Sequence, residues 1–379
     1  MSFLEYRVKF APTGLRKVLY LNWPLVLLVT AVASVGFLML YSIAGGNLDT
    51  WARPQMERFG VGMVLMFMVA LTPIWFWRSM SGVAYIVAFL LLIVVEFFGT
   101  VGMGAQRWID LGFIRLQPSE MMKFTLVMLL AVYYDWLDPK LVSRPLYVLL
   151  PVLMIVTPTV LVLMQPNLGT SLMLLLAGAT VMFAAGVSLW YFGAVIGIVV
   201  AAVVGVFTLR GTPWQFLHDY QYKRIDTFLD PAADPLGAGY NIIQAKIALG
   251  SGGWSGKGFM QGTQSRLNFL PEKHTDFIFT TLAEEFGFIG AFSLLGLYAL
   301  ILGFCLVAAW QNRDRFSALL IIGVAANFFF YIAVNLSMVM GMAPVVGVPL
   351  PLLSYGGSAM MVLLVGFGLV QSAHVHRPR

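Results

Sequence analysis

Long apolar runs separated by short polar connections dominate this chain of 379 residues. Each run is close to the length of about 20 residues that an α-helix needs to cross a bilayer. The ten runs cover 20–44, 58–77, 80–99, 119–137, 145–164, 169–186, 187–209, 277–309, 315–342 and 352–373. The pattern therefore predicts an all-α integral membrane protein with about ten transmembrane helices.

One connection, at about 210–276, is much longer than the others and is predicted to form a large extracytoplasmic loop between helices 7 and 8. It contains too many aromatic and aliphatic residues for a disordered tether. Residues 239–249, GYNIIQAKIAL, are predicted to form a short amphipathic helix at the membrane surface. Because no repeat or second soluble unit is visible, residues 1–379 are interpreted as a single polytopic membrane domain.

Composition supports a membrane protein: 60% of the residues are hydrophobic, 11% are charged, and the mean hydropathy is +0.86. A soluble domain would carry about a quarter charged residues. The net charge of +6 does not point to nucleic acid, because the basic residues are scattered between the spans, where topology and anionic membrane lipids explain them. The single cysteine, Cys305, excludes an intrachain disulfide.

Lysine and arginine in the short connections predict the orientation, since cytoplasmic connections are enriched in them. A cytoplasmic start places eleven of these residues inside and four outside. Both termini are therefore predicted to be cytoplasmic, with the long loop on the outer face. The first run lacks a small-residue cleavage site and is interpreted as a retained helix and not as a signal peptide.

A glycine cluster at 250–258 lies just after the predicted amphipathic helix. It does not match a phosphate-binding Walker A loop, because Ser251 stands where glycine is required and Lys257 is followed by Gly258 and not by serine or threonine. Its backbone N–H groups and Lys257 can still approach a pyrophosphate without that fold. A mobile surface turn explains the spacing equally well.

Asp276 stands where the loop re-enters the membrane, preceded by Glu272, Lys273 and His274. An acid at a helix N-terminus often only complements free N–H groups and the helix dipole. Alternatively, a carboxylate partly removed from water has a raised pKa and serves as a general base. Spacing alone does not separate the two interpretations.

Charged residues also lie inside predicted spans, where each costs about 2.5–3.5 kcal/mol on insertion scales and usually faces a cavity or a partner. Glu120 and Lys123 are three residues apart and share a helix face. Glu120 can also cap its helix, whereas Lys123 lies deeper. Glu284 and Glu285 also lie inside a predicted span, so each must face either a cavity or the helix bundle. Glu285 is taken as a candidate cavity residue.

Polar segments near helix ends add candidates on the predicted outer side. Arg107 and Trp108 could line a cavity, or they could anchor the chain at the membrane interface. Gln165 and Ser354 belong to segments in which proline and glycine interrupt the helix, and irregular backbone at that depth normally lines a cavity or is buried in protein. No histidine or cysteine cluster predicts a transition-metal site.

Taken together, these motifs resemble those of the SEDS family (shape, elongation, division and sporulation), most closely its RodA branch. In chain order they are Gly104-Ala-x-Arg-Trp-Ile109, Gln117-Pro-Ser-Glu-x-x-Lys123, Gln165-Pro-x-Leu-Gly-Thr170, Gly250-Ser-Gly-Gly-x-x-Gly-Lys-Gly258, Gly262-Thr-Gln264, Leu270-Pro-Glu-x-His-Thr-Asp-Phe-Ile-Phe279, Glu284-Glu285 and Gly347-Val-Pro-Leu-Pro-Leu-x-Ser-Tyr-Gly-Gly-Ser358. One departure is Asn167, where the family often has aspartate.

The resemblance implies a peptidoglycan glycosyltransferase of the bacterial inner membrane that polymerises lipid II and works with a class B penicillin-binding protein. The family's essential aspartate matches Asp276, the expected general base of an inverting displacement of undecaprenyl pyrophosphate. Candidates for binding the pyrophosphate are Lys257, Arg266, Lys273 and Arg107. A divalent cation, Mg²⁺ or Mn²⁺, can share that work, although no residue pattern demands one.

Transport is the alternative, as a lipid II flippase or a carrier of another amphiphile, because intramembrane charges and broken helices fit a transporter as well. A carrier's site belongs near the midplane, however, and the long ordered-looking loop favours chemistry at the outer face. A scaffold that only positions the penicillin-binding partner would leave Lys123 and the glutamate pair without a role.

Overall fold

The computed structural model describes residues 14–102, 105–110, 115–212, 215, 222, 225–226, 228–230, 238–267, 270 and 272–377. The motif residues Gly104 and Pro271 and much of the predicted loop at 213–237 lie outside these ranges. The long helices are α1 (Trp23–Ile43), α2 (Ala52–Leu71), α3 (Ile74–Phe98), α4 (Pro118–Trp136), α5 (Pro145–Met164), α6 (Leu168–Ala184), α7 (Leu189–Thr208), α11 (Ile278–Trp310), α12 (Arg315–Val339) and α13 (Gly357–Val375). Shorter helices are η1 (Gly14–Tyr20), α9 (Ala238–Ser251) and α10 (Thr263–Arg266).

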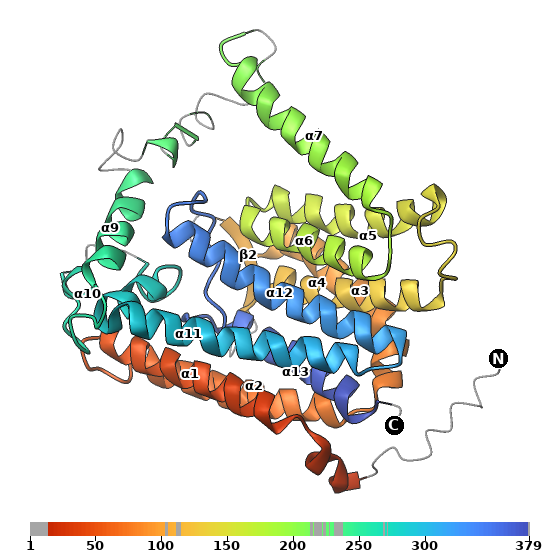
Figure 1. Ribbon diagram of the computed structural model, residues 1–379, viewed down its shortest axis with the longest axis horizontal. Coiled ribbons are helices and arrows are strands. Elements are labelled where there is room, and N and C mark those ends of the chain that lie inside the picture. The colour runs from red at the N-terminus through yellow and green to blue at the C-terminus, as the bar shows by residue number, and fades with distance from the viewer. Residues whose placement is uncertain are drawn as a thin grey trace.

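Seven of the described helices are long and apolar enough to cross a membrane, by length and composition: α1, α3, α5, α7, α11, α12 and α13. The apolar helix α6 is shorter, at 17 residues. Charged residues lower the mean hydropathy of α2 and α4, the latter through Glu120 and Lys123. Most of these helices pack side by side into one bundle (Figure 1), so the predicted helical, multi-pass architecture is confirmed.

Most predicted runs match a helix to within a few residues, but the second does not. It was expected at 58–77, whereas α2 begins at Ala52 and ends at Leu71, and α3 starts after Pro73. Proline disfavours a helical conformation in the residue before it, so Thr72-Pro73 separates the two helices. The charged residues at the start of α2 masked this boundary in the hydrophobic pattern.

A small antiparallel sheet between α3 and α4 was not predicted and departs from an all-α fold. Its strands are β1 (Thr100–Gly102), β2 (Ala105–Asp110) and β3 (Arg115–Leu116), in the order β1-β2-β3. Thr100 pairs with Trp108, and Asp110 pairs with Arg115. Strands this short carry little periodicity, which is why the sequence pattern missed them.

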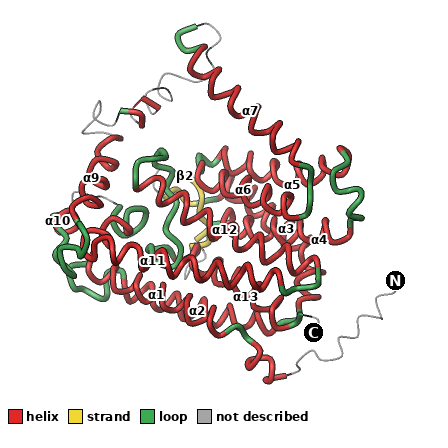
Figure 2. Tube along the Cα trace, in the orientation of Figure 1, coloured by secondary structure: helices red, strands yellow, loops and turns green. Residues whose placement is uncertain are grey.

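Helix α12 lies inside the bundle and contacts α4, α6, α11 and α13. Glycines allow close helix contacts, as expected within a membrane: a Cβ at Gly323 of α12 would come within 2.3 Å of Val127 on α4. Helix α7, by contrast, contributes no buried residue and projects from the bundle (Figures 1 and 2). The predicted short helix at 239–249 is present as α9.

Candidate active site

Asp276 lies in the turn at 272–277 that leads into α11. Its backbone carbonyl accepts a hydrogen bond from Asn335 Nδ2 at 2.9 Å. Its carboxylate faces Gly347, where an added Cβ would lie 3.6 Å from Oδ2. Burial, with repulsion from Glu272 as the lesser cause, raises the pKa of Asp276 to about 6. A carboxylate with that pKa is a stronger base than an ordinary aspartate and is still ionised at neutral pH.

The irregular segment at 343–356 packs directly on this turn. Ser354 Oγ donates a hydrogen bond to the Thr275 carbonyl at 2.6 Å and accepts one from the Leu350 N–H at 2.8 Å. The Tyr355 N–H donates to the His274 carbonyl at 2.9 Å. Ser354, which the sequence assigned to a cavity, therefore holds the Asp276 turn through its backbone.

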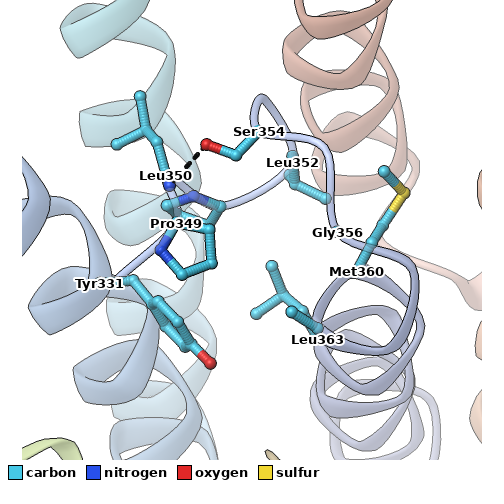
Figure 3. Close-up of a pocket in the computed structure, with 10 residues that line it drawn as sticks. Tyr331, Pro349, Leu350, Leu352, Ser354, Gly356, Met360 and Leu363 are labelled. Atoms are coloured by element: carbon cyan, nitrogen blue, oxygen red, sulfur yellow. Dashed lines mark hydrogen bonds between the residues drawn. The ribbon is translucent and has the colours of Figure 1, made fainter. Parts of the chain in front are cut away.

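A pocket lies beside this junction, between α12 and the start of α13 (Figure 3). Its lining residues include Tyr331, Pro349, Leu350, Ser354 and Met360. The cavity volume is about 20 Å³, which is room for about one water molecule. It is too small for a sugar ring, so this pocket is not the binding site for a glycan in this conformation.

Glu120 and Lys123 form a buried cluster with Tyr331 of α12. Lys123 Nζ lies 2.8 Å from Glu120 Oε1, and the Lys123 side chain is only 1% exposed. The Tyr331 hydroxyl donates to the other carboxylate oxygen of Glu120 and accepts from Lys123. Pairing compensates the cost of two charges within a span. The sequence indicated the pair but not Tyr331, because only the tertiary fold brings α12 against α4.

Arg107 is held by carbonyl groups at the end of α5. Its Nε donates to the Gln165 carbonyl at 2.9 Å, and a second guanidinium nitrogen donates to the Pro166 carbonyl. Gln165 Nε2 binds the Leu92 carbonyl at 3.1 Å, and Trp108 pairs with Thr100 in the sheet. A cation here complements the C-terminal end of the α5 dipole, so the structure gives Arg107 partners within the protein.

The departure at Asn167 has a local explanation. Asn167 is the N-cap of α6, and its side-chain oxygen accepts the Thr170 N–H at 3.4 Å. Asparagine and aspartate both serve in this position. In the next turn Gly169 lies against Val346 and Val348, where a Cβ would come within 2.8 Å of the Val346 carbonyl oxygen.

Lys257 and Glu284 form a second cluster, on the glycine cluster and the first turns of α11. Glu284 is fully buried, and its Oε1 accepts hydrogen bonds from Lys257 Nζ at 2.7 Å and from the N–H groups of Thr263 and Gln264 at 2.9 and 3.1 Å. The neighbouring Glu285 accepts from Ser42 Oγ at 2.5 Å. Lys257, a predicted pyrophosphate ligand, is thus paired with a buried carboxylate.

The glycine cluster itself packs against a break in α11. Gly287 has φ 66° and ψ −162°, a conformation that essentially only glycine adopts. The break frees carbonyl and N–H groups that the cluster then binds: Gly258 N–H donates to the Glu285 carbonyl at 3.0 Å, and Phe288 N–H donates to the Gly253 carbonyl at 2.9 Å. These contacts make the cluster a turn packed against α11 and not a mobile surface turn.

Three candidate residues remain: His274 and Lys273 in the Asp276 turn, and Arg266 on α10. His274 stacks on Trp51 with ring centroids 4.1 Å apart, and burial lowers the pKa of both His274 and Lys273. Arg266 is exposed on α10. The structure therefore brings Asp276, Lys273, His274 and Ser354 into one site, and Lys257, Glu284 and Glu285 into another.

The fold and the site define a polytopic membrane protein with a partly buried carboxylate in the turn where α11 begins. The chain belongs to the SEDS family, since the FtsW/RodA/SpoVE family model of cell cycle proteins matches residues 21–379. The resemblance inferred from the motifs is confirmed.

Curated relatives and solved structures agree with this assignment. The chain is 42% identical to the peptidoglycan glycosyltransferase MrdB of Escherichia coli K12 over 94% of both chains, and 33% identical to stage V sporulation protein E of Bacillus subtilis 168 over 91% of this chain and 94% of that one. The crystal structure of the rod shape determining protein RodA of Thermus thermophilus matches with TM-score 0.71 and 28% identity over 95% of this chain and 98% of that one. A chain of a peptidoglycan synthase complex matches with TM-score 0.80 and 31% identity over 93% of this chain and 97% of that one.

Proposed function

We propose that this chain polymerises lipid II into β-1,4-linked glycan strands at the outer face of a bacterial inner membrane during cell elongation. The enzyme class, a peptidoglycan glycosyltransferase, is confirmed by the family and by the relatives that carry this activity in their names. The observation that supports the site is the Asp276 carboxylate, whose pKa burial raises to about 6, in a turn whose backbone is held by Asn335 of α12 and by Ser354.

In the proposed reaction Asp276 removes the proton from the 4-hydroxyl of the acceptor sugar. The resulting oxygen nucleophile attacks the anomeric carbon of the donor strand and forms the new C–O bond. The bond to the α-linked pyrophosphate breaks, and its electron pair leaves with the undecaprenyl pyrophosphate. One displacement inverts the anomeric configuration, so a single base is sufficient and no covalent enzyme intermediate is required.

The leaving pyrophosphate needs positive charge beside the reacting carbon. Of the four predicted ligands, Lys273 is the nearest to Asp276 in sequence and shares its turn, whereas Lys257 binds Glu284 and Arg107 binds carbonyl groups. Within the described residues no group of three or more His, Cys, Asp or Glu side chains could hold a metal.

The proposed function also requires a membrane topology that places Asp276 outside and a partner that cross-links the glycan. Seven apolar helices together with α2, α4 and α6 would make ten spans, and the positive-inside pattern would place both termini in the cytoplasm. Asp276 would then lie at the outer face, where the sugars of lipid II are exposed. The match to a chain of a peptidoglycan synthase complex supports a class B penicillin-binding protein as the partner.

Polymerisation and transport can be separated in one preparation. The purified protein, with and without a class B penicillin-binding protein, is given labelled lipid II in detergent, and the same protein in liposomes is assayed for lipid II translocation. Glycan strands without translocation support the proposal. Translocation without glycan under both conditions would contradict it and favour the flippase.

A further inference from the structure

Asn335 of α12 connects the two segments that enclose the Asp276 carboxylate. Its Nδ2 donates to the Asp276 carbonyl at 2.9 Å and to the Val348 carbonyl at 2.7 Å. Val348 follows Gly347, the residue that faces the Asp276 carboxylate. One amide group therefore ties the backbone of Asp276 to the segment that faces its carboxylate.

The orientation of this amide follows from its partners. Both are carbonyl oxygens, which only accept hydrogen bonds, so the NH₂ group must face them and uses both of its hydrogens. Asn335 is fully buried, and its Oδ1 has no hydrogen-bond partner among the described residues. A buried acceptor without a partner is costly, and Asn327 of α12 has one as well, so what distinguishes Asn335 is the pair of carbonyls that it joins.

Helix α12 also carries Tyr331, four residues before Asn335 and therefore one turn away on the same side. Tyr331 binds Glu120 and Lys123. One rigid helix thus joins the buried charge pair to the turn that holds Asp276. This gives the Glu120–Lys123 pair a physical route to the site without direct contact.

We propose that Asn335 is a positioning residue, which holds the Asp276 carboxylate in its buried place beside Gly347 so that it meets the acceptor hydroxyl. The inference rests on the proposed role of Asp276 as the base. A catalytic group displaced by about 1 Å can lose a factor of about 100 in rate. Loss of the two hydrogen bonds would free the turn and admit water to the carboxylate.

Water would lower the pKa of Asp276 from about 6 toward the ordinary value, since burial is the main cause of the shift. Glu272, Lys273 and His274 of the same turn are the neighbouring titratable groups. Tyr355 of the 343–356 segment donates its N–H to the turn, and Asn335 of α12 binds it from the other side. A charged group from another element, Arg58 of α2, lies with its guanidinium carbon 4.9 Å from the Tyr355 ring centroid. An acid shift of the pH profile would therefore report on the exposure of Asp276.

The test compares Asn335→Leu, which keeps the branched side-chain shape and removes the amide, with wild type in lipid II polymerisation between pH 4.5 and 8.5. Asn335→Gln, which retains an amide, is the conservative variant. Asn327→Leu is the matched control, since Asn327 is also fully buried on α12 and binds the Gly323 carbonyl, away from the turn. Folding of each variant is checked by its thermal unfolding.

We expect Asn335→Leu to lower kcat about 10- to 100-fold and to move the acid limb of the profile to lower pH by about one unit. Asn335→Gln should recover part of both, and Asn327→Leu should leave the midpoint unchanged. If Asn335→Leu does not fold, the inference is tested by the midpoint of the acid limb of the pH profile of Asn335→Gln. If a folded Asn335 variant keeps the wild-type midpoint and Asp276→Asn is inactive, the inference about Asn335 is overturned and the proposed base is not. If Asp276→Asn is active, the proposed role of Asp276 as the base is overturned.

Discussion

The Lys257 ammonium group binds the fully buried Glu284 carboxylate at 2.7 Å and thereby fastens the glycine cluster to the first turns of α11. Two backbone N–H groups bind the same carboxylate oxygen. The lysine that most resembled a pyrophosphate ligand in the sequence therefore has a structural partner. This relationship separates a lysine that anchors the glycine cluster to α11 from the site around Asp276.

Replacing Lys257 with Met should lower stability, because it removes a charged donor from a buried carboxylate. We expect a loss of about 1–3 kcal/mol, measured as a lower Tm in detergent. Arg266→Met, at an exposed position of α10, is the control and should change the free energy of unfolding by no more than about 0.5 kcal/mol. An unchanged Tm with loss of polymerisation would instead assign Lys257 to the pyrophosphate.

Gly287→Ala should be strongly destabilising. A Cβ at Gly287 would come within 2.3 Å of the Gly256 nitrogen and 2.6 Å of the Trp254 oxygen, and φ is 66°. We expect a loss of more than about 3 kcal/mol. Gly296→Ala on the same helix is the matched control, since a Cβ there meets nothing within 4 Å. Equal Tm values for the two variants would contradict the break in α11.

Lys123→Met should reduce both stability and turnover. Removal of one member of a buried ion pair costs about 3–5 kcal/mol, because the other charge is left without its partner. The double variant Glu120→Gln/Lys123→Met should recover much of the stability but not the activity, if the pair tunes the site through Tyr331. Normal polymerisation by the folded double variant would remove Glu120 and Lys123 from the account.

Asp276→Asn should stabilise the protein at neutral pH. The pKa of Asp276 rises from 3.8 to about 6 on folding, so stability of the wild type falls as the pH rises from about 4 to 6 and then stays low. A difference of about 2 pK units corresponds to at most about 3 kcal/mol. The Tm of the variant should therefore exceed that of wild type at pH 8 and equal it near pH 4. Equal values at both pH values would show that the carboxylate is hydrated.

The sequence predicted the helices well because a 20-residue apolar run has few alternatives in a bilayer. It also indicated Asp276 and the Glu120–Lys123 pair, since ionisable groups are rare beside or within spans. It missed Tyr331 and Asn335, because a single tyrosine or asparagine in an apolar helix acquires a role only from what it packs against. The strands at 100–116 were too short to show a period.

The roles of the lysine residues were harder to predict than those of the acids, because they too depend on which groups the fold brings together. Lys257 and Lys273 both lie in the loop near Asp276 in sequence, and only the fold shows that one binds Glu284. The break at Gly287 was equally invisible, since α11 is continuous in its hydrophobic pattern.

The most direct test of the account is the pH dependence of lipid II polymerisation by wild type and by Asp276→Asn, each with the class B penicillin-binding protein present. The account predicts that wild-type kcat/KM falls tenfold for each pH unit below about 6, the pKa of Asp276. It also predicts that the folded variant makes no glycan at any pH. Glycan synthesis by folded Asp276→Asn would contradict the central claim.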